Sequence, residues 1–187
     1  MPVMNPTAII LNGASSAGKS SIARELVPLL GKDTISTGFD DVLLRSRAAK
    51  KGLLQRFLRQ RDPNERINVF RQLHAEVLHH LEQGKHVVVD TSIMESAAVE
   101  DLAKKLASHR AYFIGVKPPL SVSERWEKES GDRPIGQARK HYDLVHRYGE
   151  YDLVLDTSKM TPAEAAQLIV AHADEQLPAA LAHLQVH

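Results

Sequence analysis

Near its N-terminus the chain reads Thr7-Ala8-Ile9-Ile10-Leu11-Asn12-Gly13-Ala14-Ser15-Ser16-Ala17-Gly18-Lys19-Ser20. The first half is a short apolar run between Pro6 and Gly13, which is typical of a strand buried on both faces of a parallel sheet. The second half matches G-x-x-x-x-G-K-[ST] and leads into a helical pattern. This order of strand, loop and helix predicts a phosphate-binding loop rather than an ordinary glycine-rich turn.

The chemistry of such a loop comes from its backbone. Small residues let successive amide N–H groups point into one concavity at a helix N-terminus, where negative charge is favoured. We expect Lys19 to be catalytic, with its ammonium group against the β and γ phosphates of ATP, and the Ser20 hydroxyl to coordinate Mg²⁺. The predicted nucleotide contacts are Gly13, Ala14, Ser15, Ser16, Ala17, Gly18, Lys19, Ser20 and Ser21.

Strands and helices are predicted to alternate along the whole chain. Apolar segments rich in Val, Ile or Leu recur with helical stretches between them, which indicates an α/β fold with right-handed crossovers. The four further segments expected to be strands are 34–37, 86–90, 111–116 and 152–156.

Helix starts are indicated by a capping-box pattern, in which Ser, Thr or Asp is followed three residues later by Glu. Gly31 and Gly84 stand where helices are expected to end, and Pro178 is expected to break a last helix. The four patterns begin at Asp62, Ser92, Ser121 and Thr161.

Length and composition limit the class of protein. With 187 residues, 43% of them hydrophobic, the chain fits one domain over residues 1–187 that buries a sizeable core. No cysteine is present, which excludes disulfides, thiolate zinc sites and a cysteine nucleophile. No apolar run reaches the roughly 20 residues of a membrane span, and no signal-peptide pattern precedes the first strand, so we expect a cytoplasmic protein.

A carboxylate follows the second predicted strand, in Thr37-Gly38-Phe39-Asp40-Asp41. In an open parallel sheet this position lies at the carboxyl edge, beside the phosphate loop. Asp40 is therefore predicted to be the general base that accepts the proton of an attacking hydroxyl. Asp41 is interpreted instead as the cap of a helix beginning near Val42.

A second carboxylate, Asp90, ends the apolar segment His86-Val87-Val88-Val89-Asp90. This is the form of a Walker B element, whose carboxylate holds Mg²⁺ directly or through water. Two alternatives remain open at this point. Asp90 could belong to a capping turn with Thr91 and Ser92, or it could orient the acceptor.

Cations surround a Gly/Pro-punctuated loop within about residues 125–140, which we interpret as a lid that closes over the phosphates. Arg133 is the predicted catalytic arginine, and Arg125 is a second nucleotide contact. Neighbouring acidic residues could instead pair with these charges. Further along, Asp156-Thr157-Ser158-Lys159 is interpreted equally as a resting place for a purine base and as an ordinary capped loop.

These motifs together resemble the chloramphenicol phosphotransferase-like proteins, small P-loop kinases related in fold to shikimate, adenylate and adenylylsulfate kinases. The resemblance implies a P-loop NTPase/kinase fold with a five-stranded parallel sheet in the order 2-3-1-4-5, and ATP-dependent phosphorylation of a hydroxyl. It also assigns the base to Asp40 and the lid arginine to Arg133. It rests on 9–20, Gly38-Phe39-Asp40, Val87-Val88-Val89-Asp90, Gly131-Asp132-Arg133 and 151–157.

The acceptor is the least determined part. An acceptor-side helical segment is expected at about 42–72. It contains nine cationic residues but only two acidic ones, Asp62 and Glu65. Such a wall would favour an anionic acceptor, such as a nucleotide, a phosphorylated metabolite or an RNA end. Interleaved leucines indicate instead an amphipathic helix whose charges face solvent. The cations are Arg45, Arg47, Lys50, Lys51, Arg56, Arg59, Arg61, Arg66 and Arg71.

Three functional hypotheses follow. The first is a Mg²⁺- and ATP-dependent kinase of a hydroxyl on a small molecule, with antibiotics among the candidates. The second is a kinase of an anionic acceptor; nucleic acid is not favoured, because few aromatic residues interleave with the charges. The third is a nucleotide-dependent switch without transfer chemistry. Oligomeric state is left open.

Overall fold

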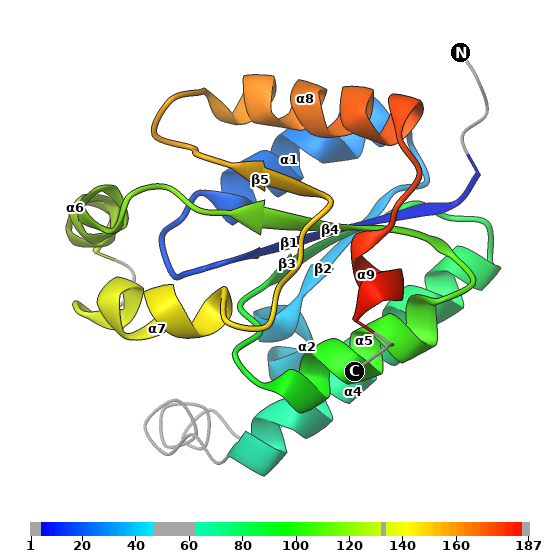
Figure 1. Ribbon diagram of the computed structural model, residues 1–187, viewed down its shortest axis with the longest axis horizontal. Helices are drawn as coiled ribbons and strands as arrows, with labels where there is room; N and C mark the ends of the chain where they lie inside the picture. The colour runs from blue at the N-terminus through cyan, green and yellow to red at the C-terminus, as the bar shows by residue number, and fades with distance from the viewer. Residues whose placement is uncertain (1–4, 47–62, 132–133, 185–187) are drawn as a thin grey trace.

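The computed structural model describes residues 5–46, 63–131 and 134–184. Five parallel strands form one sheet in the order β2-β3-β1-β4-β5 (Figure 1). This confirms the predicted α/β class, the five strands and their order. The strands are β1 (Thr7–Gly13), β2 (Ile35–Gly38), β3 (Val87–Thr91), β4 (Arg110–Val116) and β5 (Leu153–Leu155).

Two hydrophobic cores lie on opposite faces of the sheet. Side chains alternate along β1, so that Ile9 and Leu11 enter one core while Ala8 and Ile10 enter the other. The first face is covered by α1 (Lys19–Leu30) and α8 (Pro162–Glu175), and the second by α4 (Pro63–Glu82), α5 (Ser96–Leu106) and α9 (Ala180–His183). Burial on both faces explains why the strand segments are continuously apolar.

Several helix boundaries match the sequence patterns. Thr161 and Glu164 form the predicted capping box at the start of α8, and α4 begins at Pro63. Helix α1 ends at Leu30, directly before Gly31. The chain between α8 and α9 contains Pro178, as expected for a broken last helix.

Two predicted capping boxes are wrong. Helix α5 begins at Ser96 rather than after Ser92, because the Ser92 hydroxyl donates to the Gly13 carbonyl. Helix α6 (Leu120–Ser130) begins before Ser121, since the carbonyl of Pro119 already accepts the first helical hydrogen bonds. The cap predicted at Asp62 lies outside the described residues.

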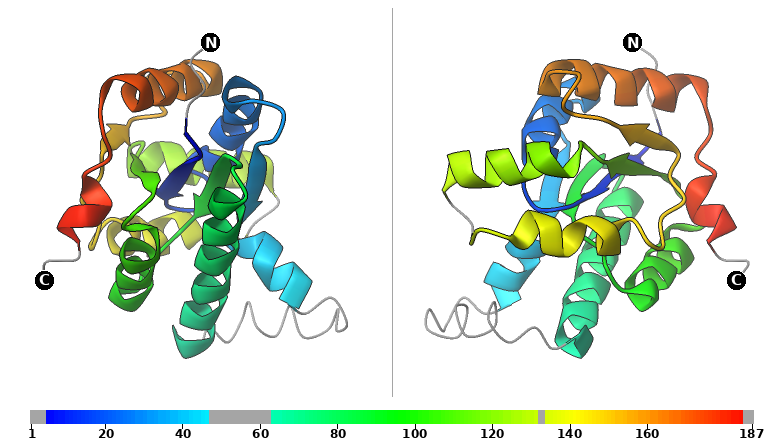
Figure 2. Two further views of the ribbon diagram at one scale, coloured as in Figure 1. Left: turned by 90° about the vertical axis from the view of Figure 1, so that its right-hand side faces the viewer. Right: turned by 60° about the vertical axis from the view of Figure 1, so that its left-hand side comes forward.

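At the carboxyl edge of the sheet lie α2 (Phe39–Ser46) and the hairpin of α6 and α7 (Gln137–Val145), as the views in Figure 2 show. Helix α2 begins at Phe39, three residues earlier than predicted, with both of its aspartates in the first turn. Negative charge is favoured at that end of a helix. Within the described residues no helix is both long and apolar enough to span a membrane.

Candidate active site

The phosphate loop connects β1 to α1 and contains two positive φ angles. Gly18 has φ 90° and Ser16 has φ 59°, both in the left-handed region that favours glycine. These residues turn the chain so that the loop leads into the N-terminus of α1. Its amides are thereby gathered at a helix end, where an anion is stabilised.

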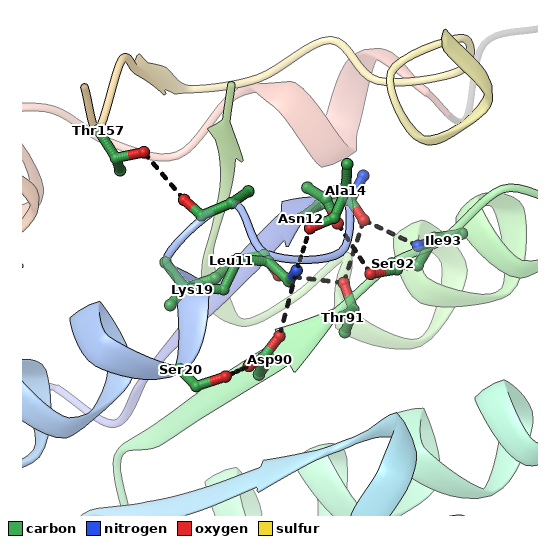
Figure 3. Close-up of polar contacts among 12 residues, drawn as sticks. Leu11, Asn12, Ala14, Lys19, Ser20, Asp90, Thr91, Ser92, Ile93 and Thr157 are labelled. Atoms are coloured by element: carbon green, nitrogen blue, oxygen red, sulfur yellow. Dashed lines mark hydrogen bonds and ion pairs between the residues drawn. The ribbon is translucent and has the colours of Figure 1, made fainter. Parts of the chain in front are cut away.

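Three polar side chains from two elements meet at this loop (Figure 3). Lys19 is 6% exposed; its Nζ donates to the Ala14 carbonyl at 2.8 Å and lies 3.7 Å from Oδ1 of Asp90. The Ser20 hydroxyl donates to Oδ2 of Asp90 at 2.6 Å. Asp90 lies in strand β3 and not in a capping turn. Its carboxylate contacts both the Lys19 ammonium and the Ser20 hydroxyl.

The loop fits a phosphorylated ligand. The Ser15 hydroxyl is buried and has no hydrogen-bond partner, which leaves a donor available inside the loop. The oxygens of Ser20 and Asp90 are of the hard type that Mg²⁺ prefers. A nucleotide phosphate and a magnesium ion would thus each find suitable groups here.

Two aspartates, Asp40 and Asp41, lie in the first turn of α2. Both are exposed, but Oδ2 of Asp41 lies 3.6 Å from the point where a side chain on Gly38 would begin, so its carboxylate turns back over the start of the helix. Because α2 already begins at Phe39, Asp41 is not the cap predicted from the sequence; it lies inside the first turn, where a negative charge is favoured. Asp40 lies in the same first turn, where β2 ends beside Asp90.

Gly38 makes this arrangement possible. A Cβ atom on Gly38 would lie 2.7 Å from the carbonyl oxygen of Asp90, closer than real Cβ contacts come. The absence of a side chain therefore lets the ends of β2 and β3 approach each other. As a result Asp40, just after β2, and Asp90, near the end of β3, lie at neighbouring strand ends.

Asn12 was not singled out from the sequence, yet it joins three segments behind the loop. Its Oδ1 accepts from the backbone N–H of Ile93 at 2.8 Å and from the Thr91 hydroxyl at 3.2 Å (Figure 3). Its Nδ2 donates to the Val145 carbonyl and to the Tyr151 hydroxyl, each at 3.0 Å. An asparagine directly before a loop glycine carries no sequence signal of such a role.

The segment after β5 also supports the loop. The Thr157 hydroxyl donates to the Ala17 carbonyl at 2.9 Å (Figure 3). Oδ1 of Asp156 accepts from the backbone and hydroxyl of Ser158, and these bonds, with Lys159, hold the pKa of the Asp156 carboxyl below its usual value. The capped-loop interpretation thus describes Asp156, while Thr157 braces the phosphate loop.

Of the nine cations between Arg45 and Arg71, the structure describes three. Arg45 pairs with Glu76 at 2.5 Å, and Arg71 donates to Asn68. Arg66 is 9% exposed and its Nε donates to Glu95 at 2.6 Å. The other six lie outside the described residues.

The Arg66 side chain links neighbouring elements of the fold. Its guanidinium lies over the rings of Phe39 and Phe70, 5.0 and 5.7 Å from their centroids, and it also donates to the Ser92 carbonyl. It therefore connects α4 both to the start of α2 and to the segment after β3. Its charge is already matched by Glu95.

The hairpin of α6 and α7 is held by a buried carboxylate. Glu127, 1% exposed, accepts from the backbone N–H groups of Gly136 and Ala138 at 2.7 Å each, which caps α7 from the neighbouring helix. Arg125 is 63% exposed and lies 3.8 Å from Glu129 rather than at the phosphate loop. Arg133 lies outside the described residues.

The chain matches a known protein family over most of its length. The family model described as chloramphenicol phosphotransferase-like protein matches residues 6–174. The chain belongs to that family. A Mycobacterium tuberculosis (strain H37Rv) protein named "Putative O-phosphotransferase" is 27% identical over 177 residues, which cover 85% of this chain and 78% of the relative.

Solved structures show the same fold at low sequence identity. The adenylylsulfate (APS) kinase CysC of M. tuberculosis, in complex with AMPPNP and APS, has a TM-score of 0.69 and 18% identity over 91% of this chain and 99% of its own. Shikimate kinase from Acinetobacter baumannii has a TM-score of 0.59 and 21% identity over 88% and 91%. A gluconokinase from Sinorhizobium meliloti has a TM-score of 0.67 and 18% identity over 90% and 92%. With the family, this P-loop kinase fold assigns the chain to the ATP-dependent phosphotransferases.

Proposed function

We propose that this protein transfers the γ-phosphate of ATP to a hydroxyl group on a small, uncharged molecule, with antibiotics among the candidate acceptors. The observation that carries the proposal is the meeting of Lys19, Ser20 and Asp90 at the phosphate loop, with Asp40 at the neighbouring strand end. The site for the phosphate donor and the proposed base thereby lie at the same edge of the sheet, where ligands bind in open α/β sheets.

In the proposed reaction the amides of the loop and Lys19 hold the phosphates of ATP. Asp40 takes the proton of the acceptor hydroxyl while that oxygen attacks the γ-phosphorus and the bond to ADP breaks. Mg²⁺, held through Ser20 and Asp90, would neutralise charge on the phosphate oxygens. The α6–α7 hairpin acts as the lid, with Arg125 and Arg133 contacting phosphate only when it closes.

An uncharged acceptor is supported by the partners of two of the three described cations. Arg66 and Arg45 are each engaged with a glutamate, so neither offers an unmatched charge to an anionic acceptor. Using them would require breaking those pairs. The six undescribed cations leave an anionic acceptor as the second candidate.

A screen with γ-labelled ATP tests the proposal. We expect label to move to an uncharged hydroxyl compound, antibiotics and nucleosides being included in the screen. We also expect KM for that acceptor to stay within about twofold as salt rises from about 50 to about 200 mM, because no charge is screened. A steep rise in KM with salt would indicate the anionic acceptor, and nucleotide binding without transfer to any acceptor would favour a switch.

The metal site gives a separate prediction. Asp90→Asn should raise the Mg²⁺ concentration for half-maximal transfer by about tenfold, because one of the charged oxygens near Ser20 is removed. A magnesium titration at fixed ATP measures it. Asp33→Asn, a change at an exposed aspartate on the turn after α1, should behave as wild type. An unchanged requirement in Asp90→Asn would show that Asp90 does not hold the metal.

A further inference from the structure

Tyr151 occupies a closely fitted slot between the sheet and the end of α7. Side chains on Gly115 or Gly149 would begin 2.7 and 2.5 Å from its ring atoms, so both glycines are needed to admit the ring. Phe113 also packs against the ring, with a centroid separation of 4.8 Å. The position of the hydroxyl is therefore determined by packing.

That hydroxyl lies where the end of α7 meets the phosphate loop. It accepts from Nδ2 of Asn12 at 3.0 Å, lies 2.8 Å from Nδ1 of His146, and is 3.3 Å from the Val145 carbonyl. Val145 is the last residue of α7, and Asn12 directly precedes Gly13. One oxygen atom thus contacts both the α6–α7 hairpin and the strand that carries the loop.

The protonation states are consistent with a persistent connection. Burial, with Lys117 and Lys19 nearby, lowers the pKa of His146 to about 4, and burial raises the pKa of Tyr151 to about 12. At neutral pH the histidine is uncharged and the phenol keeps its proton. The hydroxyl can therefore accept from Asn12 and donate to the α7 end at the same time.

We infer that Tyr151 is a positioning residue for phosphate transfer. Its hydroxyl holds the C-terminal end of α7 against Asn12, so that the closing lid reaches the correct position relative to the phosphate loop. The inference rests on the proposed function, in which the α6–α7 hairpin is the lid. Asn12 contributes both through this hydroxyl and directly: its Oδ1 accepts from Ile93 and Thr91, and its Nδ2 donates to the Tyr151 hydroxyl and to the Val145 carbonyl.

The sole tryptophan, Trp126, lies in α6 and supplies a readout that needs no acceptor. In wild-type protein, AMPPNP with Mg²⁺ should change its fluorescence as the hairpin closes. In Tyr151→Phe, which keeps the ring and removes the hydroxyl, we expect at most half of that amplitude at saturation. The concentration giving half the change should stay within about threefold, because no phosphate contact is lost.

Turnover supplies the second readout. Once an acceptor is known, Tyr151→Phe should lower kcat about tenfold while KM for ATP changes less than about threefold, since misplacement of the lid weakens the transition state more than the bound ground state. The matched control is Tyr112→Phe. Its hydroxyl also donates to backbone carbonyls, those of Ala173 and Gln176, but on the side of α8.

The outcomes separate this inference from the proposed function. If Tyr151→Phe matches Tyr112→Phe in fluorescence amplitude and kcat, the contact is only structural and the inference is wrong, although transfer itself stands. A wild-type protein that binds AMPPNP without any change at Trp126 also overturns it. If no acceptor is found, a reduced amplitude in Tyr151→Phe still supports the coupling of the hairpin to the loop.

Discussion

Lys19→Ala should reduce phosphate transfer by about a thousandfold, because it removes the one side-chain cation that the structure places inside the phosphate loop, among the residues it describes. Lys19 is buried against the loop's own Ala14 carbonyl and faces Asp90, so a bound phosphate would replace a neutral partner with a charged one. ATP affinity should fall as well, by about tenfold, since a charge-assisted hydrogen bond is lost.

The measurement is kcat and KM for ATP in steady state, with ATP affinity measured separately. Lys32→Ala is the matched control, because Lys32 is an exposed lysine beyond the other end of α1 and makes the same change in net charge. Urea unfolding and circular dichroism should show that Lys19→Ala is folded. Turnover within about threefold of wild type would contradict the role given to Lys19.

Asp40→Asn should lower kcat by between about a hundredfold and about ten-thousandfold, the range associated with loss of a general base. The amide keeps the size of the side chain but cannot take the hydroxyl proton. ATP binding should be unchanged, because Asp40 belongs to the acceptor side rather than to the loop. A kinase therefore loses turnover and retains nucleotide, whereas in a switch without transfer chemistry the substitution would leave nucleotide affinity and the biological effect unchanged.

Asp41→Asn is the control, since it removes the same charge from the same turn of α2. Its carboxylate turns back over Gly38, so we expect a small loss of stability and kcat within about threefold of wild type. Two results would count against Asp40 as the base: unchanged kcat in Asp40→Asn, or a larger loss in Asp41→Asn than in Asp40→Asn.

Much of the fold could be predicted because its signals are local. Residues 7–12 are apolar at every position but the ends, and this pattern arises from burial against two helical layers. The box at Thr161 and Glu164 is formed by neighbours in sequence, and it is present. At Ser92 the same pattern failed, since its hydroxyl bonds Gly13, 79 residues away. A pattern of neighbouring residues carries no information about a hydrogen-bond acceptor so far away in the sequence.

In the candidate site, too, some contacts could be predicted from the sequence and others could not. The contact of Ser20 with Asp90 could be anticipated, because loop and strand motifs both end at one edge of a parallel sheet. The contacts of Asn12, Tyr151 and Thr157 could not, because each depends on a backbone carbonyl in another segment of the fold, that of Val145 for the first two and that of Ala17 for Thr157. Charge counting also misses the surroundings of Arg66, whose glutamate partner lies 29 residues further along the chain and whose guanidinium lies over the rings of Phe39 and Phe70.

The central claim is that the loop between β1 and α1 binds a nucleoside triphosphate, and isothermal titration calorimetry of the full chain with ATP and Mg²⁺ tests it most directly. We predict saturable binding at one site per chain that weakens about tenfold in Lys19→Ala and is unchanged in Lys32→Ala. Absence of heat with ATP and with GTP at every practical concentration, in protein shown to be folded, would contradict the account.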